Sequence, residues 1–251
     1  MKKILVLIII FICIWSILIE PNLITVKNIT VHDNQLANLK VVFIGDIHYK
    51  SYDKYRLNRI INKINQQKPD LVLSCGDYID GFDNENKIFN EEIKNALSKI
   101  QSKYGVYTVL GNHDTNIGDL GIKILNNSNY YIKEKNLYIC GVEDSITGCP
   151  NIDKAFKNTK QPRILLMHSP DLYPDVDENV NLVLAGHNHG GQVNIPFIGP
   201  LFVPSKSGKK YLYGYFNGGI KKMFVTKGLG TSILPIRFNC IPEIVIIRFV
   251  D

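Results

Sequence analysis

Several features that would identify common protein classes are missing from this sequence of 251 residues. No two of its five cysteines form a CxxC pair and their number is odd, so neither a disulfide framework nor a structural cysteine–zinc site is indicated. No GxxxxGKS or GxxxxGKT loop is present, which removes support for nucleotide-driven phosphoryl transfer. Repeats and low-complexity linkers are also absent, and a hydrophobic fraction of 45% predicts a chain with a substantial core.

Charge of either sign is modest, because 29 Lys and Arg against 23 Asp and Glu give a net charge of +6. This excess suggests an anionic partner but is too small for a nucleic-acid coat protein. Residues 190–242 nevertheless contain seven basic residues and no acidic one. Within them, residues 195–212 form an apolar loop that ends in Lys206, Lys209 and Lys210. We expect this loop to meet anionic lipid head groups, and a solvated face is the alternative.

The first 24 residues have the pattern of a membrane segment. From residue 4 to residue 19 the only polar side chain is Ser16, and two lysines precede this run. As a helix the run would be roughly 24 Å long, which suits a short membrane anchor or a long signal-peptide core. Residues 17–22 offer no small-x-small cleavage motif, which favours an uncleaved anchor at the cell membrane. The positive-inside rule then predicts that the globular part is extracytoplasmic.

The rest of the chain predicts a linker at residues 25–38 and one α/β domain at residues 39–251. Short apolar runs typical of buried strands occur at residues 39–44, 71–74, 106–110, 163–167 and 182–185. Helical spacing of apolar residues occurs at residues 55–67 and 91–100. The last third favours antiparallel strands at residues 211–216, 221–226 and 244–249, with a turn at residues 217–219. We therefore predict a two-sheet β-sandwich flanked by helices.

Polar clusters follow each of the five buried runs, and they hold five of the six histidines. The clusters read GDIH at 45–48, GDYIDG at 76–81, GNHD at 111–114, MHSPD at 167–171 and GHNHGGQ at 186–192. Because ligands bind beyond the carboxyl ends of strands in α/β sheets, we expect these segments to converge. The residues brought together would be Asp46, His48, Asp77, Asn112, His113, His168, His187 and His189. Carboxylates, amide oxygens and imidazoles in this number suit two divalent metal ions.

Each cluster alone has an ordinary explanation, because Gly, Asn and Asp also form turns after strands. For the five clusters taken together, turn formation does not explain why nearly all histidines follow strands. A buried group of acids and imidazoles without metal would also be costly to desolvate. A degenerate descendant that keeps the pattern without turnover is the remaining alternative. His32 lies outside every cluster and is expected at the surface.

The order of these motifs, from Asp46 to His189, resembles the signature of the calcineurin-like metallophosphoesterases. GHNHGGQV, GLGTS at 228–232 and PIRFNCIPEI at 235–244 resemble the bacterial membrane-associated, YkuE-like phosphodiesterase branch. A neighbouring group with a similar pattern contains pyrophosphatases that act on UDP-diacylglucosamine. The resemblance implies an αββα fold and a dinuclear centre of divalent ions, for which Mn, Fe, Zn and Co all remain open.

Residue roles carried over from this resemblance divide the cluster into ligands and a catalytic pair. One ion would be held by Asp46, His48 and His189. The other would be held by Asn112, His168 and His187. Asp77 would bridge both ions. His113 would stabilise or protonate the scissile phosphate ester with its ring oriented by Asp114, and Asp80 would support the site from outside the ligand set.

These inferences predict a membrane-tethered phosphohydrolase or phosphodiesterase in which a metal-bridging hydroxide attacks a phosphate ester. We expect a lipid-linked substrate because the anchor and the loop at residues 195–212 place the site at a membrane. A UDP-diacylglucosamine-type pyrophosphatase and a non-catalytic metal-binding scaffold are the alternatives. No nucleic-acid partner is expected, because basic residues are not interleaved with aromatic stacking positions. The sequence carries no prediction of oligomeric state.

Overall fold

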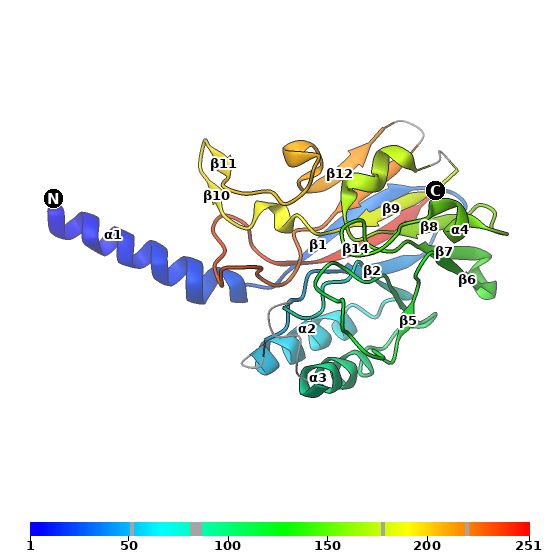
Figure 1. Cartoon of the computed structure of the whole chain (residues 1–251), viewed down its shortest axis with the longest axis horizontal. Coiled ribbons are helices and arrows are strands. Elements are labelled where there is room, and N and C mark those ends of the chain that lie inside the picture. The colour runs from blue at the N-terminus through cyan, green and yellow to red at the C-terminus, as the bar shows by residue number, and fades with distance from the viewer. Residues whose placement is uncertain (51–52, 81–86, 177–178, 219–220) are drawn as a thin grey trace.

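The computed structural model describes residues 1–50, 53–80, 87–176, 179–218 and 221–251. Two six-stranded mixed sheets form the centre of the molecule (Figure 1). The first sheet contains, in spatial order, β1 (Thr25–His32), β14 (Glu243–Val250), β2 (Lys40–Ile44), β3 (Leu71–Ser74), β4 (Val106–Thr108) and β5 (Lys123–Ile124). The second contains β12 (Gly214–Asn217), β13 (Lys222–Val225), β9 (Leu182–Ala185), β8 (Arg163–Leu166), β7 (Leu137–Gly141) and β6 (Ser128–Ile132).

Helices cover the outer faces of this sandwich. The first sheet is covered by α2 (Lys54–Gln66) and α3 (Lys87–Leu97), and the second by α4 (Ile152–Phe156) with short 3₁₀ turns. Strand β2 shows how the layers form, because successive side chains point to opposite faces of a sheet. Val41 and Phe43 pack between the two sheets, whereas Val42 and Ile44 pack against the helices. The predicted two-sheet sandwich flanked by helices is confirmed.

The segment predicted as a linker differs from expectation, because residues 25–32 form β1. This strand pairs in parallel with β14, from Thr25 opposite Glu243 to His32 opposite Val250. Val31 is buried between the sheets and Val26 packs on the helix side, so β1 is an edge strand of the core. The alternation of apolar and polar residues along this strand is interrupted by Lys27 and Asn28, which is why the segment resembles a linker.

The predicted strand at residues 211–216 is also shorter than expected. A 3₁₀ turn covers Gly208–Tyr211, and β12 begins only at Gly214. Tyr211 points into the apolar layer outside the second sheet, where its ring meets the ring of Tyr173 edge-on at 5.5 Å. The predicted turn at residues 217–219 extends to Gly219, which lies outside the described residues.

A single apolar helix projects from the sandwich at the N-terminus (Figure 1). Helix α1 (Lys2–Ile14) continues through a π turn and a 3₁₀ turn to Asn22, giving 21 residues whose most apolar stretch of 18 residues has a mean hydropathy of 2.8. None of the residues of α1 is buried, in contrast to the apolar face of α2. By length and composition this helix is a candidate membrane anchor.

The last turns of this helix are bonded to the domain. The Glu20 side chain is 1% exposed and accepts hydrogen bonds from the backbone N–H groups of Asn239 (3.0 Å) and Cys240. It also accepts one from the indole of Trp15 at 2.6 Å. The Ser16 carbonyl accepts from the backbone N–H of Arg237 at 2.9 Å. The foot of this helix, residues 15–22, is therefore part of the folded domain.

Arg237 holds the adjacent loops together. Its side chain is completely buried, and its guanidinium donates hydrogen bonds to the carbonyls of Gly230, Lys227 and Cys240 at 2.6 to 2.9 Å. The rigid fork of an arginine can satisfy several carbonyls at once, which a lysine cannot do equally well. These contacts fix the segment that follows β13 against the segment that leads into β14.

We predict that Arg237→Met lowers the free energy of unfolding by about 3 kcal/mol, because three buried carbonyls would lose their donors. The matched control is Arg248→Met on the exposed side of β14, which should change the free energy by less than about 0.5 kcal/mol. Urea unfolding of the full chain in mild detergent measures both. Equal losses for the two variants would contradict this role of Arg237.

Candidate metal centre

The sequence-predicted site residues all lie in loops that follow the carboxyl ends of central strands. These loops follow β2 (Asp46, His48), β3 (Asp77), β4 (Asn112, His113, Asp114), β8 (His168) and β9 (His187, His189). The structure brings them into one buried cluster, and the histidines and aspartates of the predicted ligand set are all at most 6% exposed. His32 is exposed at the end of β1, as expected.

The backbone of these loops is wound so that neighbouring side chains face one point. Five of the seven predicted ligands have positive φ angles between 45° and 69°: Asp46, His48, Asp77, His187 and His189. Non-glycine residues rarely adopt this conformation, and it persists where the surrounding structure enforces it. In both the D-x-H and the H-x-H pair, the left-handed turn directs two side chains to the same side of the loop.

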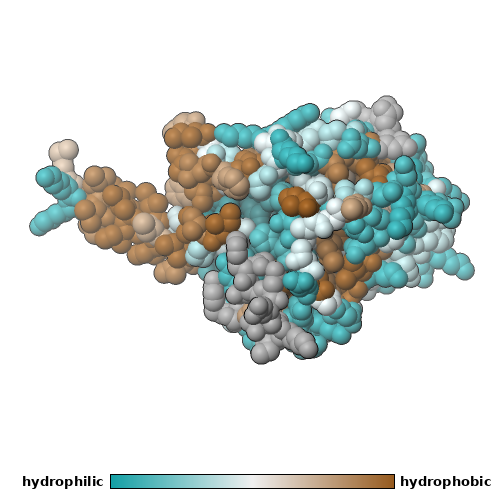
Figure 2. Space-filling view, in the orientation of Figure 1, coloured by the Kyte–Doolittle hydropathy of each residue, from teal (hydrophilic) through white to brown (hydrophobic). Residues whose placement is uncertain are grey.

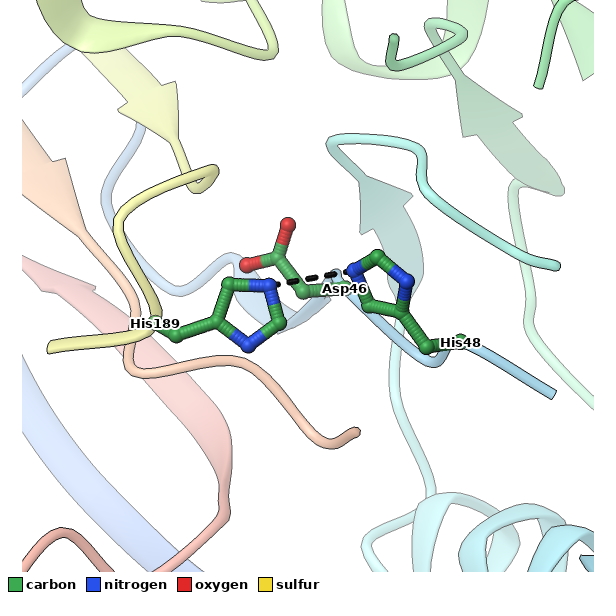
Figure 3. Close-up of side chains that lie close together, drawn as sticks. All are labelled: Asp46, His48 and His189. Carbon is green, nitrogen blue, oxygen red and sulfur yellow. Dashed lines mark hydrogen bonds between the residues drawn. The ribbon is translucent and has the colours of Figure 1, made fainter. Parts of the chain in front are cut away.

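The first group of ligand atoms is formed by Asp46, His48 and His189, whose ligand atoms lie within 4.8 Å of one another. The Nε2 atoms of His48 and His189 are 3.0 Å apart. Figure 3 shows the two rings directed toward each other with the Asp46 carboxylate beside them. This arrangement of two imidazoles and a carboxylate has the donor types of a transition-metal site.

The second group is centred on His168. Its Nε2 atom lies 3.0 Å from Asn112 Oδ1 and 3.1 Å from His187 Nδ1. Its Nδ1 atom is 2.7 Å from the carbonyl of Cys75, which fixes the ring orientation and leaves Nε2 directed toward the other two side chains.

Asp77 joins the two groups through one oxygen. Its Oδ2 atom is 3.3 Å from His48 Nε2 in the first group and 3.3 Å from His168 Nε2 in the second. Its Oδ1 atom accepts a hydrogen bond from the backbone N–H of His113 at 2.9 Å, which holds the carboxylate in place. This is the position expected of a bridging carboxylate.

The chemistry of these donors fits bound divalent cations. Asp46 and Asp77 are at most 2% exposed, and among the described residues their ion-pair partners are histidines alone. The Oδ2 atom of Asp46 is buried without a hydrogen-bond partner. Burying such groups without compensating charge is costly, so the donor set fits two metal ions.

The pKa values of these side chains are shifted by their burial and by the charges of their neighbours. Burial raises the pKa of Asp77, but His168 and His48 outweigh it and hold that pKa well below its ordinary value. Burial lowers the pKa of His168, but Asp77 and Asp46 outweigh it and raise the pKa to about 10. Burial lowers the pKa of His187 to about 4. The Asp77 carboxylate therefore attracts positive charge strongly, which favours the binding of divalent cations, whereas burial raises the pKa of Asp46.

His113 lies beside the predicted ligands and is more exposed than the histidines and aspartates among them. Its ring meets the ring of His48 edge-on, with centroids 4.7 Å apart, and its side chain is 17% exposed. Burial lowers the pKa of this imidazole. Its Nδ1 atom is 3.9 Å from Asp80 Oδ1, and Asp80 also pairs with Lys50 at 3.1 Å. Asp80 thus faces the His113 ring from outside the predicted ligand set.

The sequence predicts that Asp114 orients the His113 ring, and the structure shows a different set of contacts for its carboxylate. The Asp114 carboxylate instead accepts hydrogen bonds from the backbone N–H groups of Asp77 (2.7 Å), Tyr78 (2.8 Å) and Gly111 (2.9 Å). A carboxylate that is 2% exposed and bonded to three amides links the loop after β3 to the loop after β4. Asp114 therefore positions the loops that carry Asp77 and Asn112.

Gly228 is a site residue to which the sequence assigned no role, although its GLGTS motif was noted. A Cβ atom on Gly228 would lie 2.6 Å from Asp46 Cβ and 2.7 Å from Asp46 Oδ2, and the residue has a φ of +69°. The amides that follow, of Leu229 and Gly230, donate to the Asp46 carbonyl. Strand β13 is another apolar run that ends in a glycine-containing loop, and this signal could have identified the segment.

We predict that Gly228→Ala displaces the Asp46 carboxylate and weakens metal binding by about 10–100-fold. The matched control is Gly208→Ala, because Gly208 has a φ of +56° but no atom within 4 Å of the added Cβ. Both variants carry the strain of a left-handed alanine, and only the first intrudes on the centre. Titration with Mn²⁺ measures the affinity, and equal weakening in both variants would contradict the prediction.

Comparisons with known proteins agree with this site. Residues 39–191 match the family model described as calcineurin-like phosphoesterase. The "Uncharacterized metallophosphoesterase YkuE" of Bacillus subtilis strain 168 is 30% identical over 249 residues, which cover 91% of this chain and 86% of that protein. The "Phosphodiesterase YaeI" of Escherichia coli K12 is 31% identical over 232 residues, which cover 85% and 83%.

A protein of Bos taurus, "Transmembrane protein with metallophosphoesterase domain", is 26% identical over 268 residues, covering 90% of this chain and 56% of that protein. The family match covers the segments that carry the predicted ligands, and the layered sandwich holds those segments in one cluster. Members of this family use a dinuclear centre of divalent metal ions and hydrolyse phosphoric esters. The chain belongs to the calcineurin-like phosphoesterase family and is a metallophosphoesterase.

Proposed function

We propose that this protein is a membrane-tethered phosphodiesterase whose substrate is a lipid-linked phosphate ester. The observation that carries the catalytic part is the position of Asp77 Oδ2, which lies 3.3 Å from an imidazole nitrogen of each ligand group. A single carboxylate oxygen shared in this way is the arrangement that a two-metal hydrolytic site needs.

The geometry supports the following ligand assignment. Asp46, His48 and His189 hold one ion, Asn112, His168 and His187 hold the other, and Asp77 bridges them. When bound, two divalent cations at this site lower the pKa of water and polarise the phosphate oxygens. The protein contributes a rigid frame, because three backbone amides fix Asp114 and the Cys75 carbonyl fixes His168.

His113 is the catalytic side chain in this proposal. It is the histidine of the cluster with the greatest exposure, so it faces an incoming ester. Burial keeps its imidazole neutral in the free protein, and the negative charge of a bound phosphate favours its protonated form. A protonated His113 donates a hydrogen bond to the phosphate and passes its proton to the leaving oxygen as the phosphorus–oxygen bond breaks.

The tether in this proposal is α1 with its foot at residues 15–22. Its 21 residues are long and apolar enough to cross a membrane, and the bovine relative is named a transmembrane protein. Lys2 and Lys3 at its start favour an N-terminus in the cytoplasm and a catalytic domain outside it. Cys149 is exposed on the domain, so its labelling in intact cells by a membrane-impermeant maleimide tests this orientation.

We predict different losses for substitutions at the bridging and the catalytic residue. Asp77→Asn should abolish turnover and the stoichiometric binding of metal, because it removes negative charge that both ligand groups share. His113→Asn should lower kcat by about 10²–10⁴-fold while the metal is retained. His32→Asn, the same substitution at an exposed histidine, is the control and should match the unaltered protein.

Elemental analysis and hydrolysis of bis(p-nitrophenyl) phosphate with added Mn²⁺ provide the two measurements. Loss of metal from the His113 variant comparable to that from the Asp77 variant would contradict the division between ligands and catalyst. Full metal content without hydrolysis of any phosphate ester by the unaltered protein would instead support the scaffold alternative.

We also predict a preference for substrates held in a membrane. With the full chain in vesicles, kcat/KM for a phospholipid-like diester should exceed that for a small soluble diester by on the order of tenfold or more, because both partners are confined to one surface. Equal values of kcat/KM for the two diesters would overturn the proposal that the substrate is lipid-linked and would leave the proposed phosphodiesterase activity intact. Cleavage of UDP-diacylglucosamine alone would favour the pyrophosphatase alternative.

A further inference from the structure

Large apolar side chains crowd the tip of one hairpin outside the sandwich. The short strands β10 (Asn194–Ile195) and β11 (Gly199–Pro200) form this hairpin. The exposed fractions at its tip and after it are 108% for Phe197, 68% for Ile198, 66% for Leu201 and 62% for Phe202. Single exposed apolar residues are ordinary, but a group of this density marks a surface that contacts an apolar partner.

A second exposed pair lies in a neighbouring loop. Ile233 is 65% exposed and Leu234 is 56% exposed. The Gln192 side chain donates hydrogen bonds to the carbonyls of Ser232 (3.0 Å) and Leu234 (3.2 Å), which ties this loop to the base of the hairpin. We define the apolar loop surface by six residues: Phe197, Ile198, Leu201, Phe202, Ile233 and Leu234.

Backbone strain holds two of these side chains outward. Phe197 has a φ of 68° and Ile233 has a φ of 64°. A left-handed conformation is a genuine outlier for a β-branched residue such as isoleucine. The strain is not compensated by burial of either side chain, because both remain largely in solvent. Such a combination is typical of loops shaped for a function.

The apolar loop surface adjoins the foot of the anchor. The backbone N–H of Asn194 donates to the Phe238 carbonyl at 2.8 Å, and that of Arg237 donates to the Ser16 carbonyl at 2.9 Å. Trp15 and Pro196 line the same cavity of about 360 Å³. Figure 1 shows the hairpin on the side of the domain from which α1 projects, and Figure 2 shows apolar residues gathered there and along the helix.

Cations border this surface. Lys206, Lys209 and Lys210 are exposed and follow the hairpin in sequence. The Nζ atom of Lys209 would lie 3.5 Å from a Cβ on Gly199, so this lysine lies over the hairpin. Apolar side chains that enter the acyl boundary, with lysines at the level of anionic head groups, are the pattern of a protein that rests on a membrane.

We propose that the apolar loop surface inserts into the interface of an anionic bilayer beside α1, as a second membrane contact of the same chain. The proposal rests on the insertion of α1 described under the proposed function. The occupant is the lipid of the leaflet next to the anchor foot. His189 and Gly191 directly precede this hairpin, so the contact also sets how the metal centre is presented to that leaflet.

The test measures the depth of nitroxide labels on the full chain in vesicles containing anionic phospholipid. One variant keeps the exposed Cys13 of α1 and carries Cys149→Ser, and the others carry Cys13→Ser and Cys149→Ser with one new cysteine. The new cysteines are Phe197→Cys, Leu234→Cys and the control Tyr131→Cys. Tyr131 is 40% exposed on β6, at the opposite end of the molecule from α1 in Figure 1.

We expect the labels at positions 197 and 234 to collide readily with oxygen and poorly with a water-soluble nickel chelate, as the label on Cys13 does. The label at position 131 should show the reverse. If the labels at positions 197 and 234 collide mainly with the nickel chelate while the label on Cys13 collides mainly with oxygen, this proposal is overturned and the tether remains supported. Water-like collision at Cys13 as well would overturn both. Low collision with both reagents at position 197 would indicate a protein partner and would also overturn it.

Discussion

The Asp77 carboxylate is buried between two sets of imidazoles, and this burial determines the geometry of the centre. At 2% exposure this group cannot be solvated by water, so its charge must be balanced by what surrounds it. Each of its oxygens is committed, Oδ1 to the His113 amide and Oδ2 to the nitrogens of His48 and His168. The positions of the other ligands follow from this, because donors on both sides must face one oxygen.

Residues outside the predicted ligand set hold these donors in position around Asp77. Asp114 ties two ligand loops through three backbone amides, and the absence of a side chain at Gly228 leaves space for the Asp46 carboxylate. Cys240 donates from its thiol to the His189 carbonyl at 3.1 Å, and Arg237 donates to the Cys240 carbonyl. The C-terminal segment thus supports His189, a predicted ligand that lies earlier in the chain.

Much of the fold and of the ligand cluster could be predicted, because short apolar runs followed by Gly with Asp or His carry a local signal. The strand β1 was missed because its alternation is interrupted by polar residues that its edge position tolerates. The role of Asp114 could not be inferred, because its partners are backbone amides that leave no trace in the sequence. Arg237 resembles any surface arginine until the loops around it are placed. The roles of residues that act through tertiary contacts could therefore not be predicted from the sequence.

The bonds at Glu20 have a mechanical consequence. A swivelling linker would let a tethered enzyme sample many heights and tilts above a bilayer. In this chain, residues 15–22 are hydrogen-bonded to residues 237–240, and β1 enters the sheet at Thr25, so little free chain separates helix from domain. With α1 in a membrane, the enzyme would work at one fixed height. Its search for substrate would then be two-dimensional, and lateral diffusion in the membrane would set how often it meets each ester.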